Sequence, residues 1–206
     1  MTRRILGIDC GINGACALYL PDSPVPTIPE GLFDIPTIGE SKQREIDYAG
    51  LRNLIFATKP DVAVIEIVNA FMPAPAEGEE QVRWGGTSMF RFGGAYFAIH
   101  AVVACLDIPR HRVSSPAWKG HFGLKGKAKG GGTDDSARQV VLRRWPSVQP
   151  FLKRKADQHR AEAFLMAAWY AETDGGRIKA KRAPRPKTAL RAPTMEFEDD
   201  GLDIPE

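Results

Sequence analysis

The stretch RRILGIDCGINGACALYL (residues 3–20) decides the fold. It opens with a nearly continuous apolar run that ends at Cys10, passes through GING (11–14), and returns to apolar residues up to Leu20. Glycine and asparagine tolerate positive φ, so this pattern predicts a β-hairpin. Asp9 is the polar exception, because it stands at the end of the first apolar strand.

Two further strands and a helix follow this hairpin in the sequence. A third strand is expected around residues 31–38. Asp47 is suited to cap a helix that ends before Lys59-Pro60, because the residue before a proline is biased away from helical geometry. The run DVAVIEIV (61–68) is rich in β-branched residues, as is typical of a strand in a sheet that is covered on both faces.

The second half alternates helices with one more strand. A loop rich in proline and glycine (69–86) precedes a helix at Met89–Leu106, which is apolar nearly all round and is therefore expected to be buried on two sides. A fifth strand is expected at Arg112–Ser114, and an amphipathic helix at Asp157–Glu172. The predicted fold class is α/β, a five-stranded mixed sheet with helices on both faces.

Composition bounds the class of protein. The chain has 206 residues, of which 43% are apolar and 26% charged, which suits one globular domain with an appendage. The three cysteines lack CxxC spacing, so neither a zinc site nor a disulfide scaffold is indicated. We expect no signal peptide, no association with a membrane, and a cytoplasmic location.

Charge is strongly segregated along the chain. Residues 108–156 hold twelve basic and two acidic side chains, a net charge of +10, whereas the rest of the body carries −7. This indicates a basic face beside an acidic pocket, although a basic stretch can also be a plain solvated surface. In residues 174–206, seven basic residues are followed by mostly acidic ones, so we expect a globular domain at 1–173 and a disordered charged tail.

Two acidic residues lie within apolar strands. Asp9 closes the first strand, and Glu66 lies between isoleucines in VAVIEIV. Because an ionised carboxylate is costly to bury without a partner, each needs a cation, a hydrogen-bond network or a raised pKa. The plainer alternative is an exposed aspartate at the sheet edge and a glutamate that pairs with an arginine.

The last helix adds a second polar pair. His159 and Glu162 are three residues apart and therefore lie on one helix face, surrounded by alanines that let the helix approach the sheet closely. Such a pair alone is more often part of a surface. Asp157 stands at the helix start, where it would simply cap the helix.

Together these acids suit the hydrolysis of a phosphodiester. That reaction requires a deprotonated water and a stabilised leaving oxygen, which two divalent ions about 4 Å apart provide. Mg²⁺ prefers oxygen ligands, which favours Asp9, Glu66 and Glu162 as its ligands. His159 would carry a proton or serve as an occasional ligand.

The strand IxGIDCGxxGA, the strand VIE and the helix HxxEA, after a long basic stretch, resemble the RuvC-type Holliday junction resolvases of the RNase H-like superfamily. The resemblance covers residues 3–172 and implies an RNase H-like fold. It also implies a catalytic tetrad of Asp9, Glu66, His159 and Glu162 with two Mg²⁺ ions, for which Mn²⁺ can substitute. The family's last carboxylate is usually aspartate, and Asp157 is a second candidate for the third position.

The resemblance further implies paired symmetric nicks in four-way junctions and other branched DNA. It implies a homodimer, which the apolar helix at Met89–Leu106 also favours. Lys119 matches a basic residue near the scissile phosphate, and the long loop after Glu66 matches a segment that supplies an aromatic wedge at the crossover. The expected DNA contacts are Lys119, Lys125, Lys127, Lys129 and Arg112, and the wedge candidates are Phe71 and then Met72, although a loop aromatic residue can equally belong to the core. The long loop and the tail indicate a phage-encoded or otherwise divergent member.

Other functions fit parts of the pattern. A DNA-binding or assembly protein with the same fold would keep the basic face without turnover. An RNA-processing nuclease of the resolvase type would keep the acids and change the substrate. An ATPase of the actin and sugar-kinase type shares a strand, an aspartate and a hairpin, but this chain is too short for the two lobes that such enzymes need.

Overall fold

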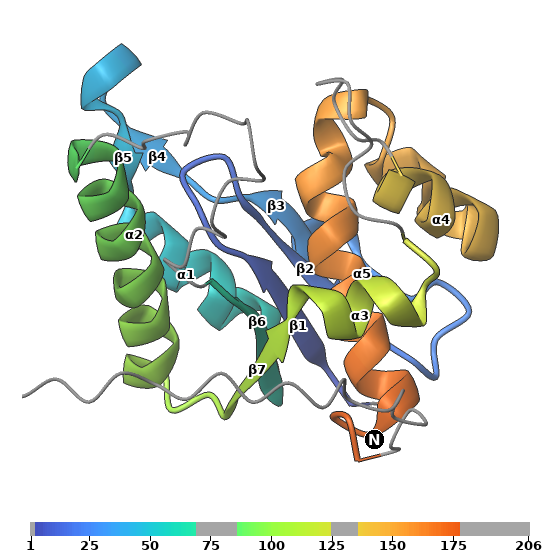
Figure 1. Ribbon diagram of the computed structural model, residues 1–206. Helices are drawn as coiled ribbons and strands as arrows, with labels where there is room; N and C mark the ends of the chain where they lie inside the picture. The colour runs from blue at the N-terminus through green and yellow to red at the C-terminus, as the bar shows by residue number, and fades with distance from the viewer. Residues whose placement is uncertain (1–2, 69–85, 125–135, 178–206) are drawn as a thin grey trace, which may run out of the picture.

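The computed structural model describes residues 3–68, 86–124 and 136–177, and its centre is a five-stranded mixed sheet (Figure 1). The first three strands are antiparallel neighbours, and the last two run parallel to the first. In the order β3-β2-β1-β6-β7, they are β3 (Leu32–Asp34), β2 (Ala15–Tyr19), β1 (Ile5–Asp9), β6 (Val62–Ile67) and β7 (Arg110–Ser114).

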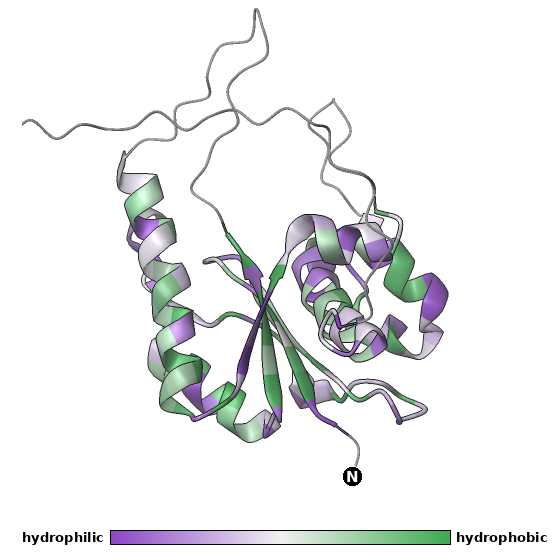
Figure 2. Ribbon diagram, turned by 60° about the horizontal axis from the view of Figure 1, so that its bottom comes forward, coloured by the Kyte–Doolittle hydropathy of each residue, from purple (hydrophilic) through white to green (hydrophobic). Residues whose placement is uncertain are grey.

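Helices cover both faces of this sheet. α1 and α2 lie on one face, and α3, α4 and α5 lie on the other (Figures 1 and 2). The expected α/β fold class, a five-stranded mixed sheet with helices on both faces, is therefore confirmed. The α-helices are α1 (Tyr48–Thr58), α2 (Gly86–Cys105), α3 (Ser115–His121), α4 (Ser136–Arg144) and α5 (Gln158–Thr173), and short 3-10 turns occupy η1 (Pro29–Gly31), η2 (Ser41–Gln43), η3 (Pro146–Phe151) and η4 (Lys155–Asp157).

The predicted hairpin forms between β1 and β2. Asp9 pairs with Ala15, and the amide of Gly14 donates to the carbonyl oxygen of Gly11 at 3.0 Å. A Cβ atom at Gly14 would lie 2.1 Å from the carbonyl oxygen of Asp9, so only glycine allows the turn to close this tightly. The turn therefore fixes the end of β1, where Asp9 stands.

Alternation along the strands divides the core into two layers. Ile5, Val64 and Val113 face α5, whereas Leu6 and Ile8 face α1 and α2. Helix α5 lies very close to the sheet, because a Cβ atom at Gly7 would lie 1.8 Å from the carbonyl oxygen of Ala163. The close approach predicted from the alanines of this helix is thus observed.

The region after β2 departs from the predicted strand at 31–38. β3 ends at Asp34, and residues Thr37–Ile38 form β4, which pairs with β5 (Glu45–Ile46) in a separate two-stranded sheet. Pro36 lies between the two strands and has no amide proton to donate to a ladder, which explains the break. The helix after Asp47 is confirmed, since the side chain of Asp47 accepts from the amide of Gly50 at 2.9 Å.

Helix α2 is not buried on two sides as predicted. Its buried residues are Tyr96, Ile99 and Val103, whereas Phe90 is 83% and Phe97 72% exposed. The described residues cover only the side of α2 that faces the sheet, so the apolar side chains on its other side are exposed. In the described part of the chain, α2 is also the one helix that is long and apolar enough to cross a membrane, and 17% of its 18-residue apolar stretch is buried. The cytoplasmic location stays a prediction.

The predicted domain boundary coincides with the end of the last helix. α5 ends at Thr173, and residues 174–177 form turns. The rest of the predicted tail lies outside the described residues, so the division at 173 and 174 stays a prediction.

Candidate active site

Two neighbouring parallel strands bring Asp9 and Glu66 to the same edge of the sheet. Ile8 of β1 pairs with Ile65 of β6, so Asp9 and Glu66 are the next residues at the carboxyl ends of these strands. Val64 faces α5, and alternation gives Glu66 the same side. Asp9 is 9% exposed, so its carboxylate is a buried polar group.

Helix α5, which packs on the sheet, adds His159 and Glu162. Nδ1 of His159 lies 2.7 Å from Oδ2 of Asp9. One ligand atom from each of Asp9, His159 and Glu162 can be chosen so that all three lie within 4.8 Å of one another. The structure therefore brings together three of the four residues of the predicted tetrad, and their catalytic role stays a prediction.

Glu66 is held beside this cluster by a tryptophan. Trp118 of α3 is fully buried, and its Nε1 donates to Oε1 of Glu66 at 3.2 Å. Glu66 is not one of the three clustered residues, but its negative charge contributes to the raised pKa of Glu162. The structure therefore places Glu66, the remaining member of the predicted tetrad, at the rim of the cluster.

Two more side chains hold Glu162. Nζ of Lys119 lies 3.9 Å from Oε1 of Glu162, and Nε2 of Gln158 donates to the same oxygen at 3.3 Å. Lys119 was expected from the resemblance to lie near the scissile phosphate; the structure places it beside Glu162, and its contact with DNA stays a prediction. Gln158 was missed, although its i, i+4 spacing from Glu162 was a usable signal. Trp118 was also missed, and no spacing in the sequence points to it.

The site lacks positive charge relative to its acids. Burial raises the pKa of Glu162, and the nearby charge of Asp9 raises it further, while Lys119 and Gln158 oppose this effect. The hydrogen bond with Asp9 raises the pKa of His159 against the opposing effect of burial. Glu162 and His159 therefore hold protons more readily than usual, because a proton offsets the nearby negative charge. A metal cation bound at the same point would offset that charge too.

The donor atoms of this site suit a hard divalent cation. Carboxylate oxygens are the ligands that Mg²⁺ and Mn²⁺ prefer, and Asp9 and Glu162 supply them within the cluster. Burial raises the pKa of the neighbouring Cys10 far above its usual range, so this thiol stays protonated and is a poor metal ligand. Asp9, Glu162 and the adjacent Glu66 would hold the ion.

Asp157 does not join the cluster. Its Oδ2 accepts from the amide of Arg154 at 2.8 Å, and its Oδ1 accepts from Nη2 of the same arginine at 2.7 Å. Burial alone would raise the pKa of Asp157, but these bonds outweigh it and lower the pKa. This carboxylate closes the turn η4 before α5 and is 3% exposed.

The predicted DNA-binding residues are placed unevenly. Arg112 precedes Val113, which faces α5, so Arg112 points to the opposite face. There, burial lowers the pKa of His100, and the charges of Arg110 and Arg112 lower it further. The structure therefore does not bring Arg112 to the site. Lys125, Lys127, Lys129, Phe71 and Met72 lie outside the described residues.

Part of the basic stretch serves the fold. Arg138 donates to the carbonyl oxygen of Leu152 at 3.0 Å, and Arg144 pairs with Glu172 at 2.7 Å. Arg154 bonds to Asp157 as described above. The net charge of this segment therefore overstates the number of basic groups available to a polyanion.

Comparisons with known proteins give likenesses among solved structures alone. No protein-family model matches the sequence, and no curated protein matches it. The chain is similar to Thermus thermophilus RuvC in complex with a Holliday junction substrate, with 18% identity, a TM-score of 0.45, and coverage of 84% of this chain and 96% of that chain. A second Thermus thermophilus RuvC structure gives 14% identity, a TM-score of 0.45, and coverage of 84% and 97%. At such identities, a likeness concerns the fold alone.

Proposed function

We propose that this protein is a divalent-metal-dependent endodeoxyribonuclease that resolves four-way junctions and other branched DNA by paired symmetric nicks. The observation that carries the proposal is the convergence of Asp9, His159 and Glu162 within 4.8 Å, beside Glu66 on the neighbouring strand. Buried and partly buried acids that gather without enough cationic partners are suited to bind Mg²⁺, and Mn²⁺ is expected to substitute. We expect two divalent metal ions in each active site.

Each side chain has a distinct role in this proposal. When bound, divalent ions activate a water and neutralise charge on the phosphate. Asp9, Glu66 and Glu162 would hold them, and Trp118 orients the carboxylate of Glu66. His159 shares a proton at Nδ1 with Asp9, which leaves Nε2 to exchange a proton with the leaving oxygen.

Positive charge at the site comes from Lys119. Its ammonium group lies over the ring of Trp118, 5.0 Å from the ring centroid, and 3.9 Å from Glu162. A phosphate bound at the carboxylates would therefore meet this lysine. Contacts from Lys125, Lys127 and Lys129, and a wedge at Phe71 or Met72, belong to the same proposal.

Helix α2 supplies the proposed homodimer interface. Met89, Phe90 and Phe97 are 37%, 83% and 72% exposed. Large apolar side chains exposed together on one helix mark an association surface. A twofold pairing through this face would present two active sites to two strands of one junction.

The deciding experiment uses a panel of substrates. The full chain is incubated in Mg²⁺ with a synthetic four-way junction, a linear duplex and a single-stranded RNA, and the nicks are mapped on each strand. The proposal predicts a pair of symmetric nicks in the junction, little cutting of the linear duplex, and loss of cutting in Asp9→Asn. Tight junction binding without nicks would favour a DNA-binding or assembly protein, and preference for RNA would favour an RNA-processing nuclease.

A further inference from the structure

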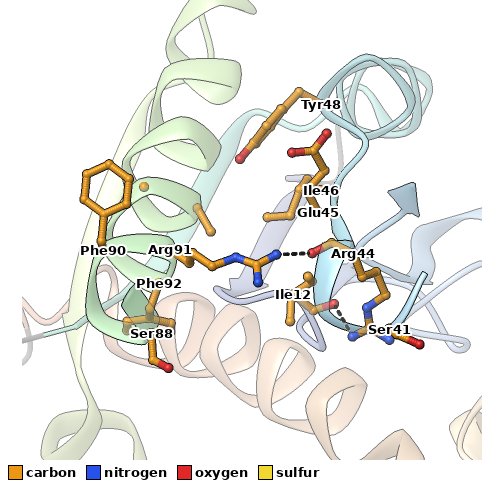
Figure 3. A pocket seen from close by; sticks show the side chains of 12 residues that line it. Ile12, Ser41, Arg44, Glu45, Ile46, Tyr48, Ser88, Phe90, Arg91 and Phe92 are labelled. Atoms are coloured by element: carbon orange, nitrogen blue, oxygen red, sulfur yellow. Dashed lines mark hydrogen bonds between the residues drawn. The ribbon is translucent and has the colours of Figure 1, made fainter. Parts of the chain in front are cut away.

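A cavity opens between the N-terminal half of α2 and the segment that carries η2 and β5 (Figure 3). Its volume is about 460 Å³, within the range of roughly 300–1,000 Å³ that is typical of small-ligand sites. None of the clustered residues Asp9, His159 and Glu162 lines this cavity, and its walls carry charged, polar and apolar side chains. The side chains that matter here are Ile12, Arg44, Glu45, Tyr48, Arg91 and Phe92.

One wall of this cavity is the turn that follows Asp9. Ile12 lies in that turn, and Nη2 of Arg44 donates to its carbonyl oxygen at 3.4 Å and also contacts the side chain of Asn13. A Cβ atom at Gly11 would lie 3.8 Å from the ring of Phe92. The cavity is therefore built onto the backbone that positions Asp9, and a strand cleaved at Asp9 would have its neighbouring nucleotides beside it.

The lining combines flat surfaces with charge. Arg91 reaches across from α2, and its Nη2 donates to the carbonyl oxygen of Arg44 at 2.8 Å (Figure 3). Tyr48 and Phe92 present aromatic rings, and Glu45 presents an exposed carboxylate. Aromatic rings and guanidinium planes stack on unpaired bases, and a carboxylate accepts hydrogen bonds from the amino group of a base.

We infer that this cavity holds one unpaired, amino-bearing nucleobase of the bound DNA strand, next to the bond that is cut. The inference rests on the nuclease function proposed above and adds a base preference to it. Tyr48 and Phe92 supply the stacking surfaces, Arg44 and Arg91 supply positive charge toward the phosphates, and Glu45 selects a base with an exocyclic amino group. Thymine, which has no such group, is the disfavoured base.

The test measures junction binding in Ca²⁺, with the full chain and with the nucleotides that flank the mapped nick changed one at a time. Each position carries each of the four bases or an abasic residue. One position should show a Kd about tenfold weaker for the abasic residue, since stacking of one base contributes roughly this much. At the same position, thymine should bind more weakly than adenine, cytosine or guanine.

Two variants connect that preference to the cavity. Tyr48→Ala should remove the abasic penalty, and Glu45→Gln should remove the discrimination against thymine. Phe56→Ala is the matched control, because Phe56 is an exposed aromatic residue of the same helix that does not line the cavity, and it should keep both effects.

The outcomes separate this inference from the proposed function. Junction cleavage in Mg²⁺ with no base-sensitive position, or with an abasic penalty unchanged in Tyr48→Ala, overturns the cavity's role and leaves the nuclease intact. An unchanged penalty together with loss of the dimer in Tyr48→Ala would assign the cavity to a second copy of the chain. Absence of both junction binding and cleavage in the parent chain overturns the proposed function and this inference together.

Discussion

Helices α5 and α2 are both apolar, yet they lie in opposite environments (Figure 2). Ten of the sixteen residues of α5 are buried, whereas three of the twenty residues of α2 are buried. The difference comes from what packs on each helix: α5 lies between the sheet and α4, whereas α2 packs with one side only, over the sheet and against α1, in the described part of the chain. Alanines let the backbone of α5 rest on β1 at Gly7, while α2 carries phenylalanines that the rest of the described chain does not cover.

In each helix, the informative residues are those whose exposure differs from what the helix or the residue type would lead one to expect. In largely buried α5, exposed His159 and partly buried Glu162 are such residues, and they form the candidate active site beside Asp9. In exposed α2, the large aromatic residues Phe90 and Phe97 are such residues, and they form the proposed dimer interface. Apolar content by itself predicts neither.

The largest effect should follow from disturbing the contact of α5. Gly7→Ala places a methyl group where the carbonyl oxygen of Ala163 lies 1.8 Å away, so β1 and α5 must separate. We expect a loss of about 3 kcal/mol or more in the free energy of unfolding, measured by urea denaturation. Gly93→Ala in α2 is the matched control, since a methyl group there meets no atom within 4 Å. It should leave stability unchanged or raise it by about 0.5–1 kcal/mol. Equal effects at the two glycines would contradict the difference between the helices.

The exposed face of α2 gives the second prediction. Phe97→Glu places a charge in both halves of the proposed interface, so the dimer dissociation constant should rise at least about a hundredfold in analytical ultracentrifugation. The melting temperature of the monomer should barely change, because surface substitutions usually alter stability by within about 0.5 kcal/mol. Phe56→Glu on α1 is the control and should stay dimeric.

Two results would refute this use of α2. A parent chain that is monomeric at every concentration would remove the interface. A parent chain that floats with phosphatidylcholine vesicles, while Phe97→Glu does not, would assign α2 to a membrane instead.

Trp118 tests how the site beside α5 is held. Trp118→Phe keeps an aromatic ring in the core and removes the donor to Glu66, so cleavage should slow about tenfold and need more Mg²⁺ for half-maximal rate. Trp169→Phe, in the buried part of α5, is the matched control and should keep the parent's Mg²⁺ dependence. A purely structural role for Trp118 would lower stability in both variants and leave the Mg²⁺ dependence of both unchanged.

The smallest effect concerns pH. Because the folded-state pKa values of Glu162 and His159 are raised, the native state binds more protons than the unfolded state. For Glu162, stability in EDTA should therefore fall as pH rises above the ordinary glutamate pKa of 4.5. For His159, the stabilisation from its pair with Asp9 should be complete below pH 6.5 and should be lost as pH rises through the raised folded-state pKa of His159.

Glu162→Gln isolates the glutamate. At neutral pH in EDTA, this variant should melt a few degrees above the parent, because each kcal/mol gained in the free energy of unfolding raises the melting temperature by about 2–4 °C. The difference should vanish below pH 4.5. Exposed Glu40→Gln is the control and should follow the parent at every pH. If Glu162→Gln also follows the parent throughout, burial does not raise the pKa of Glu162.

The sequence allowed prediction of those features that depend on local pattern. The hairpin around Gly11 to Gly14, the apolar strand with Glu66 and the one-turn spacing of His159 and Glu162 each leave a signal within a few residues. The bond from Trp118 to Glu66 leaves none, because it joins residues 52 apart whose proximity depends on the placement of α3. The exposure of α2 could not be predicted either, since an apolar helix reads the same whether the chain or a partner covers it.

Direct metal binding tests the central claim. Mn²⁺ binding to the full chain is measured by electron paramagnetic resonance for the parent, Asp9→Asn, Glu162→Gln and the control Glu40→Gln. The parent and the control should bind Mn²⁺ alike, while each site variant should bind at least about tenfold more weakly, because a ligand has been neutralised. Equal Mn²⁺ affinity in all four proteins would contradict a metal centre at Asp9 and Glu162.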